Sequence, residues 1–317
     1  MKQFVFLLIT LCSITNSIQS QNQVTTPPTT LTQWLAGVES PLDPWYQKYV
    51  SADGLPIVSS AAVSDTALLQ ARFIANHMLS RIPEAREEMI RCHFRIGVAG
   101  YQENITDLPE CRMMNVWWPD TDWDQRGRGY AATLYLPVMS IGEENLVKIP
   151  DFRERYWGES IMVHEFAHDV DFALRRINTS FCDSLAAAYN NAKNKGLWKG
   201  TYSMTNSEEY FAEGPQAWFS TCRMVVPRSS GGSFTLKTRE QLRDYDPQLY
   251  RLCASIFPEE HLHGYHFEFN TPPTTLNAVI PDEITPATIY SLTGQSITSP
   301  LSNHLYIING KKVVIRR

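Results

Sequence analysis

The pentapeptide His164-Glu165-Phe166-Ala167-His168 constrains this chain more than any other segment. Two histidines four residues apart lie about 40° from each other around an α-helix, so both imidazoles can face one point. A Zn²⁺ ion fits that point, and the glutamate between the histidines can act as a base toward a water molecule on the ion. Apolar residues flank the motif, and we therefore predict a metal-binding helix over residues 158–176.

A catalytic zinc ion needs a third protein ligand and an open position. The segment 206–219 is amphipathic and puts Glu209, Glu213 and Gln216 on one face of a second predicted helix. We expect Glu209 to be the third ligand and Glu213 to accept a hydrogen bond from a ligand histidine. Because the two glutamates are one helical turn apart, Glu213 as the ligand stays open as the alternative.

Three further side chains are weaker candidates for this centre. Asp171 lies seven residues after His164 and returns to within about 20° of the same helix face. Its carboxylate either orients a ligand imidazole through the second ring N–H or is a solvated surface group. His261 and His263 are alternative third ligands, but they lie in a loop-like segment far along the chain.

The two motifs resemble the Glu-ligand zincins, the class of zinc metallopeptidases to which thermolysin belongs. The strongest likeness is to the catalytic domain of anthrax lethal factor, which has an HEFxH helix and a later E-[FY]-F-A-E helix. Here these motifs are residues 164–168 and 209–213, and the likeness covers residues 157–219. The chain is also similar to secreted bacterial proteins that share the HEFAH and WKGTY…EY(W/F)AEG stretches. Gly214-Pro215 interrupts the second helix where the toxin continues it, so substrate specificity is not transferred.

The resemblance implies a role for each matching residue. His164, His168 and Glu209 would bind Zn²⁺, Glu165 would be the general base, and Tyr202 would supply a hydroxyl beside the reacting carbonyl. The implied activity is hydrolysis of peptide bonds in a protein or peptide substrate.

The expected architecture is α+β, with a small sheet over the metal helix and a mostly helical second lobe. The alternative is a non-catalytic, zinc-stabilised, secreted binding or adhesion protein. In that case the aromatic loop 117–130 would be its contact surface.

The ends of the chain differ in composition from its middle. A lysine followed by a short apolar run and small residues is typical of a secretory signal peptide, and this predicts a secreted or cell-surface protein. Two Thr/Pro-rich stretches, one after the signal peptide and one before the last thirty residues, predict a flexible spacer and a linker. The predicted organisation is a signal peptide at 1–20, a spacer at 21–32, a catalytic domain at 33–268, a linker at 269–287 and a β tail at 288–317.

The last thirty residues form a separate pattern. Ile289-Tyr290, Gly294-Gln295 and the run 305–313 predict short strands and a hairpin with an Asn-Gly turn. They resemble the C-terminal tails of exported Bacteroidales proteins, in which such segments act in sorting. The resemblance implies export machinery as a partner.

Composition excludes some partners and leaves others open. A net charge of −5 argues against nucleic acid, and no apolar run is long enough to predict a transmembrane helix. Five cysteines follow the signal peptide, which allows two disulfides at most. If they form, we favour Cys92–Cys111 and Cys182–Cys222; buried free thiols are the alternative.

Periodicity and end signals predict the remaining elements. A helix with Ser64 as N-cap should cover 64–80, and an edge strand should precede the metal helix. The other expected helices are 83–91, 183–195, 207–221, one opened by Thr238 and one from Pro247 to Ile256, and the expected strands are 94–99 and 132–140.

Overall fold

The computed structural model describes residues 23–150, 152, 154–264 and four short strands in the last thirty residues. The chain divides into two compact units, Met1–Pro272 and Pro273–Arg317, and their boundary falls inside the predicted linker. The predicted signal peptide lies outside the described residues.

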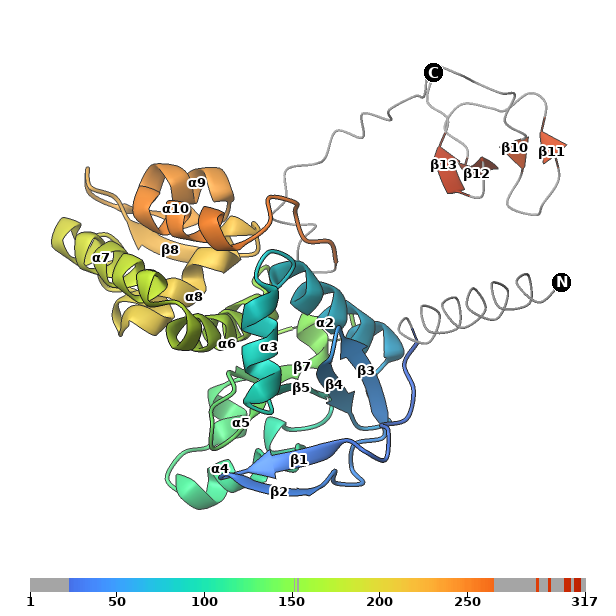
Figure 1. Cartoon of the computed structure of the whole chain (residues 1–317). Helices are drawn as coiled ribbons and strands as arrows, with labels where there is room; N and C mark the ends of the chain where they lie inside the picture. Colours follow the sequence, from blue (N-terminus) through green and yellow to red (C-terminus); the bar gives the residue numbers. More distant parts are fainter. Residues whose placement is uncertain are drawn as a thin grey trace, which may run out of the picture. The chain divides into compact units, whose positions relative to one another are not determined.

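A five-stranded mixed sheet forms one half of the first unit (Figure 1). Its order is β3-β4-β5-β7-β6, in which β4, β5 and β7 run parallel and the two outer strands run antiparallel to their neighbours. Strands β5 and β7 are fully buried. The bounds are β3 Lys48–Ala52, β4 Leu55–Ser59, β5 Arg95–Ala99, β7 Val138–Gly142 and β6 Gly129–Tyr130.

The two faces of this sheet carry different cores. Along β5, Ile96 and Val98 belong to the main core, whereas Ala99 belongs to a second, smaller core. The main core lies between the sheet and helices α2 (Asp65–Met78), α3 (Pro83–Arg91) and α6 (Ile161–Ile177), and it continues into the helical half of the unit. The smaller core packs under η1 (Ile105–Asp107) and α4 (Arg112–Trp117). The hairpin of β1 (Thr32–Leu35) and β2 (Val38–Pro41) contributes Leu35 to its edge.

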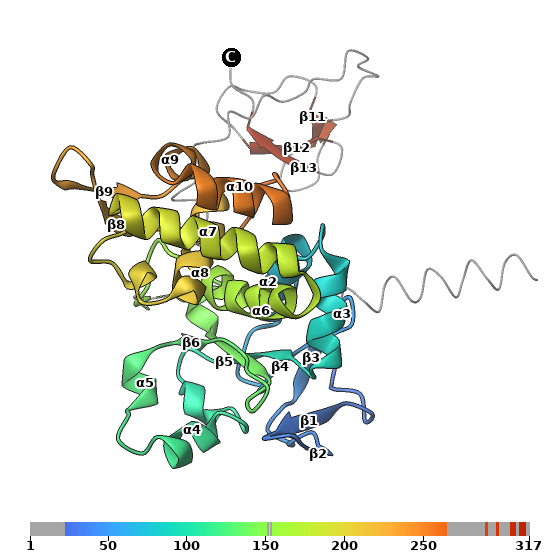
Figure 2. The same cartoon turned by 60° about the vertical axis from the view of Figure 1, so that its left-hand side comes forward.

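The other half of the first unit is mostly helical (Figure 2). It contains α7 (Thr179–Lys195), α8 (Ser207–Trp218), α9 (Arg239–Tyr245) and α10 (Pro247–Ile256), with a hairpin of β8 (Met224–Pro227) and β9 (Ser233–Leu236). Asp246 lies at its centre and accepts hydrogen bonds from Trp198 Nε1 at 3.0 Å and from the Tyr210 hydroxyl at 2.7 Å. Because Asp246 is fully buried, these two donors offset its desolvation.

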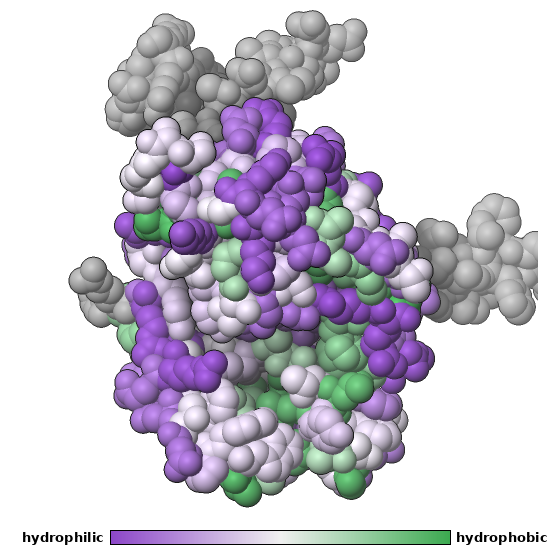
Figure 3. Space-filling view, turned by 90° about the vertical axis from the view of Figure 1, so that its left-hand side faces the viewer, coloured by the Kyte–Doolittle hydropathy of each residue, from purple (hydrophilic) through white to green (hydrophobic). Residues whose placement is uncertain are grey.

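The surface reflects this division. In Figure 3 hydrophobic residues gather around a hollow in the lower half of the face shown, while hydrophilic residues dominate its upper part. Exposed apolar side chains of the sheet half include Val116, Trp118, Leu134 and Tyr135. Among the described residues, no helix is long and apolar enough to span a membrane.

The structure confirms the mixed α+β architecture and most predicted helices, with Ser64 capping α2. The strand predicted over 132–140 is shorter, Val138–Gly142, and it is interior rather than at the edge. The edge strand is β6, inside the segment 117–130 that we predicted to be a loop, which also contains α5 (Trp123–Arg126). Within the predicted spacer, Thr25 forms an isolated antiparallel β-bridge with Tyr49.

The five cysteines are free thiols in different surroundings, so neither favoured disulfide forms. Cys92 lies 3.6 Å from Glu88, and Cys111 is buried in the smaller core. Cys182 contacts the Arg175 carbonyl, and Cys222 contacts Glu213. Each favoured pair is therefore divided between separate parts of the fold.

The second unit contains an antiparallel sheet of order β11-β10-β12-β13. The predicted hairpin strands are present as β12 (Leu305–Ile308) and β13 (Lys311–Val314). The other two strands are β10 (Ile289–Tyr290) and β11 (Ser296–Ile297). The predicted Asn-Gly turn at 309–310 lies outside the described residues.

Candidate metal centre

Helix α6 presents its two histidines on one face because its start and its apolar side are both fixed. The Ser160 side chain caps the helix by accepting from the Val163 N–H. Asn145 Oδ1 accepts from the Met162 N–H, which satisfies a second free amide of the first turn. The rings of His164 and His168 then lie 5.0 Å apart, centroid to centroid.

Helix α8 brings Glu209 to these histidines. Asn206 caps this helix through the Glu209 N–H at 2.7 Å, which sets Glu209 in the first turn. Its Oε2 lies 3.1 Å from His164 Nε2 and 3.3 Å from His168 Nε2. The three potential ligand atoms lie within 4.8 Å of one another, so this group could hold a metal ion. Two imidazole nitrogens and one carboxylate oxygen are a donor set that suits zinc.

The remaining ring nitrogen of His164 is held by Gln216. His164 Nδ1 donates to Gln216 Oε1 at 3.1 Å, and Gln216 Nε2 in turn donates to the Ser160 carbonyl. Glu213 Oε1 is further away, 3.9 Å from the same nitrogen. The expected hydrogen-bond acceptor, Glu213, is thus replaced by Gln216, which lies on the helix face we identified but had no assigned role. Gln216 fixes the tautomer that leaves Nε2 free for a metal.

The Gly214-Pro215 interruption does not end α8. A Cβ at position 214 would lie 2.8 Å from Cys253 Sγ and 2.9 Å from Leu249 Cδ1, so glycine permits close packing against α10. The helix continues through Pro215 to Trp218. Gln216, which bonds to His164, therefore keeps its helical position.

Glu165 lies against the edge strand. The Ala131 N–H donates to its carboxylate, and burial raises its pKa above the ordinary value. A Cβ on Gly129 would lie 2.7 Å from Ile161 Cγ2 and 3.1 Å from Glu165 Cγ. Glycine at this position therefore lets β6 approach the metal helix. No sequence signal that we used identifies this requirement.

The site opens into a cleft of about 590 Å³ between the two halves of the first unit. One wall carries His164, Glu165, His168 and Glu209, and the other carries the edge strand. The remaining lining residues are Arg126, Gly127, Gly129, Tyr130, Ala131, Tyr156, Tyr202 and Glu208.

The charges at the centre are strongly coupled. Burial lowers the pKa of His164, but the hydrogen bond to Glu209 and the nearby carboxylates outweigh it and raise that pKa to about 9. Burial acts on Glu209 in the opposite direction, and the two histidines hold its pKa well below the ordinary value. Burial raises the pKa of Glu213 to about 7. Because the pKa of His164 is raised, metal uptake at its Nε2 must release a proton from this ring.

Asp171 is not the partner of an imidazole in this structure. Its carboxylate accepts from Arg175 Nε at 2.8 Å, and Arg175 also reaches Ser207 and Glu208. Asp171 therefore ties the second half of α6 to the start of α8 through Arg175. This pairing supports the metal centre by holding the two helices together rather than by touching a ligand.

Tyr202 lies at the mouth of the cleft in η3 (Tyr202–Met204) and is 54% exposed. Its hydroxyl shares a hydrogen bond with Glu209, and burial followed by the Glu209 charge raises its pKa. The two weaker candidates lie elsewhere: the His263 ring stacks on Phe73, and His261 does not line the cleft. Of the candidate ligands, the structure brings His164, His168 and Glu209 together.

Comparisons of this chain with protein-family models, with curated proteins and with solved structures find no match. The site itself therefore carries the functional argument. Its strongest element is a three-residue donor set that faces an open cleft beside the half-buried Glu165.

Proposed function

We propose that this chain is a zinc-dependent endopeptidase of the Glu-zincin type. The observation that carries the proposal is the convergence of His164, His168 and Glu209 at a cleft that Glu165 also lines. When bound, zinc would lower the pKa of a water molecule and polarise the scissile carbonyl. His164, His168 and Glu209 would hold the ion, because their donor atoms already face one point.

The chain's own groups can move the proton. Glu165 would take the proton of the attacking water and deliver it to the leaving amine. Burial raises its pKa above the ordinary value, and a stronger base takes a proton from water more readily. The Tyr202 hydroxyl would donate a hydrogen bond to the oxygen that gains negative charge. Its half-exposed position leaves it free to turn from Glu209 toward a substrate.

The edge strand supports a peptide as substrate. Strand β6 pairs with β7 on one side and ends the sheet order on the other. Its outer backbone groups can pair with an extended peptide, as in other cases of strand addition. Because Gly129 lies against Glu165, a peptide on this strand would pass directly beside the base.

Cleavage of a broad peptide library tests this function. We expect the purified protein to cut peptides, to lose activity with a chelator and to regain it with zinc. Glu165→Gln should lower the rate at least about a hundredfold, because general bases contribute that much or more. Cleavage that persists in Glu165→Gln would remove the mechanism. Zinc binding without cleavage would favour a zinc-stabilised binding protein.

We also propose that the chain is exported and that its β tail serves in sorting. The support is the sequence pattern of both ends, together with the separate sheet of the second unit. Mass spectrometry of the protein from culture medium would reveal removal of residues 1–20 and the state of the tail. Finding the intact chain inside the cell would contradict this.

A further inference from the structure

Among the described residues that line the cleft, one positively charged side chain forms no ion pair within the protein. The other charged residues that line the cleft are committed: Glu165 and the donor set to the proposed reaction, and Glu208 to Arg175 at 3.2 Å. Arg126 is the remaining one. Across the described part of the chain, its guanidinium has no carboxylate within 4.0 Å, and its recorded contact is with the ring of Trp123.

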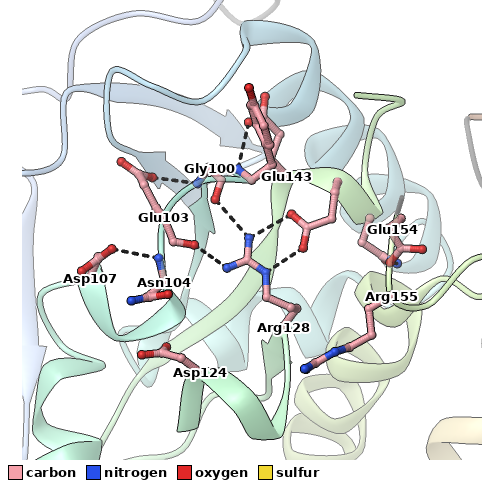
Figure 4. Close-up of polar contacts among 12 residues, drawn as sticks. Gly100, Glu103, Asn104, Asp107, Asp124, Arg128, Glu143, Glu154 and Arg155 are labelled. Carbon is pink, nitrogen blue, oxygen red and sulfur yellow. Dashed lines mark hydrogen bonds and ion pairs between the residues drawn. The ribbon is translucent and has the colours of Figure 1, made fainter. Parts of the chain in front are cut away.

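The neighbouring arginines, unlike Arg126, donate hydrogen bonds through their guanidinium groups. Arg128 is fully engaged: it bonds to both oxygens of Glu144, at 2.6 and 2.9 Å, and to the carbonyls of Gly100 and Glu103 (Figure 4). Arg155 donates to the Gln125 carbonyl. These two arginines fasten the segment that precedes β6. Arg126 lies in the same segment, and its backbone N–H donates to the Asp122 carbonyl, but none of the hydrogen bonds described for this segment comes from its guanidinium.

The Arg126 side chain is exposed, but its guanidinium lies over the ring of Trp123. Its guanidinium carbon lies 5.2 Å from the centre of the Trp123 ring. Trp123 is itself fixed, because its Nε1 donates to the Met114 carbonyl at 3.1 Å and its carbonyl accepts from the Tyr130 hydroxyl at 2.5 Å. An arginine supported in this way loses less side-chain freedom when it binds a ligand.

Arg126 lies on the wall of the cleft that carries the edge strand, and the lining also includes Tyr130 and Tyr202. Burial raises the pKa of both Tyr130 and Tyr202, and the charge of Arg126 opposes this rise at each hydroxyl. Tyr130 is on the edge strand, and Tyr202 shares a hydrogen bond with Glu209. A peptide laid along β6 would therefore pass the guanidinium near the proposed metal centre.

We propose that Arg126 binds a carboxylate of the peptide substrate, so that the cleft selects peptides carrying negative charge beside the scissile bond. The planar guanidinium can make two parallel hydrogen bonds to a carboxylate, which an amide cannot accept in the same way. The inference deepens the proposed function and rests on it. The carboxylate comes from an Asp or Glu side chain or from a free C terminus, and both present the same group.

Matched peptides test the inference in two assays. Library cleavage first provides a cut sequence, which is then made with Glu or Gln at each position beside the cut and with a free or amidated C terminus. We expect about a tenfold higher kcat/KM for the charged peptide, mostly through KM, and a preference that falls with added salt. Arg126→Gln should abolish the preference, and Arg126→Glu should transfer it to peptides with lysine. Arg243→Gln, on the exposed face of α9, is the matched control and should keep it.

A binding assay decides the question without catalysis. Zinc-loaded Glu165→Gln protein is exposed to a random peptide library, and the retained peptides are sequenced with and without Arg126→Gln. Enrichment of acidic residues or free C termini that requires Arg126 supports the inference, and the two arms show which carboxylate is bound. Zinc-dependent cleavage without charge preference would overturn the inference and leave the proposed function in place. Acidic enrichment without any cleavage would remove the endopeptidase and keep the carboxylate site, while an absence of both would overturn both proposals.

Discussion

The two walls of the cleft are built in different ways. The helical wall places His164 and His168 by the spacing of one helix and Glu209 by the cap of another. The sheet wall, residues 126–131, has little regular structure beyond the two residues of β6. It is held by Arg128, whose bonds reach Gly100, Glu103 and Glu144. Local periodicity thus sets the proposed chemistry, and a long-range polar network sets the surface that a substrate would meet.

Because the two walls are held in different ways, substitutions in each wall should have different effects. Substitution on the helical wall should change metal binding while the fold persists, because helix packing and caps hold the backbone. Substitution in the network around Arg128 should loosen the opposite wall and leave the donor set intact. The largest expected effect therefore comes from the network rather than from the metal residues.

Arg128→Met should lower the free energy of unfolding by about 3 kcal/mol, because it removes the guanidinium that pairs with the buried Glu144 carboxylate. Urea denaturation measures this change. Arg155→Met removes one exposed bond to the same segment and should cost less than about 1 kcal/mol. Zinc uptake by the folded fraction should match that of the unchanged protein. A loss of zinc affinity as large as the loss of stability would show that the two walls are not independent.

The same contrast explains which elements the sequence predicts. Helices α2, α3 and α7 begin or end at Ser64, Pro83 and Gly196, whose local preferences are strong. The metal motif and Glu209 follow from helical spacing. These features depend on residues within a few positions of one another, so periodicity is enough to find them.

Features that depend on distant contacts were misplaced. Strand β6 has only two residues, and it exists because it pairs with β7 and because Gly129 fits against α6. Spacing alone does not separate Gln216 from Glu213, since both lie on the face toward His164; the distance of each to Nδ1 decides. The favoured disulfides failed for a similar reason, because sequence proximity does not indicate which thiols meet.

Glu209→Ala tests the helical wall directly. It should weaken zinc binding at least about a hundredfold, more than the loss of a residue that only supports a ligand. Glu213→Gln should change it only a few-fold, because Glu213 lies 3.9 Å from His164 Nδ1 and Gln216 already holds that nitrogen. Isothermal titration with zinc gives both values. Full affinity in Glu209→Ala with a large loss in Glu213→Gln would reverse the assignment.

Gly129→Ala tests the contact between the two walls, because Gly129 of the sheet wall lies against α6 of the helical wall. The added Cβ would lie 2.7 Å from Ile161 Cγ2 and 3.1 Å from Glu165 Cγ, so β6 or these two side chains must shift. We expect about a tenfold loss of kcat/KM for peptide cleavage, because small displacements of a base are costly. Zinc affinity should be unchanged, since the three donors are on the other wall. Gly231→Ala, in the β8–β9 turn with open space around it, controls for the added methyl, although its positive φ allows a small loss of stability. A fall in zinc affinity in Gly129→Ala would mean that the edge strand also positions the ligands.

Glu154→Gln should give the smallest effect. It tests the contact between Glu154 and Asn145, the residue that holds the start of α6. Asn145 Nδ2 donates to Glu154, while Asn145 Oδ1 holds the first turn of α6. Burial raises the pKa of Glu154 from 4.5 to about 7. A carboxyl group whose pKa is raised by folding stabilises the native state most below its unfolded value, and this stability is lost as pH rises from 4.5 through 7. Glutamine cannot ionise, so the variant should be more stable than the unchanged protein at pH 8 by about 1 kcal/mol. The stabilities of the two proteins should become equal near pH 4. Thermal unfolding of both proteins between pH 4 and pH 8 measures this difference. A constant difference at every pH would show that Glu154 acts through its shape and not its charge.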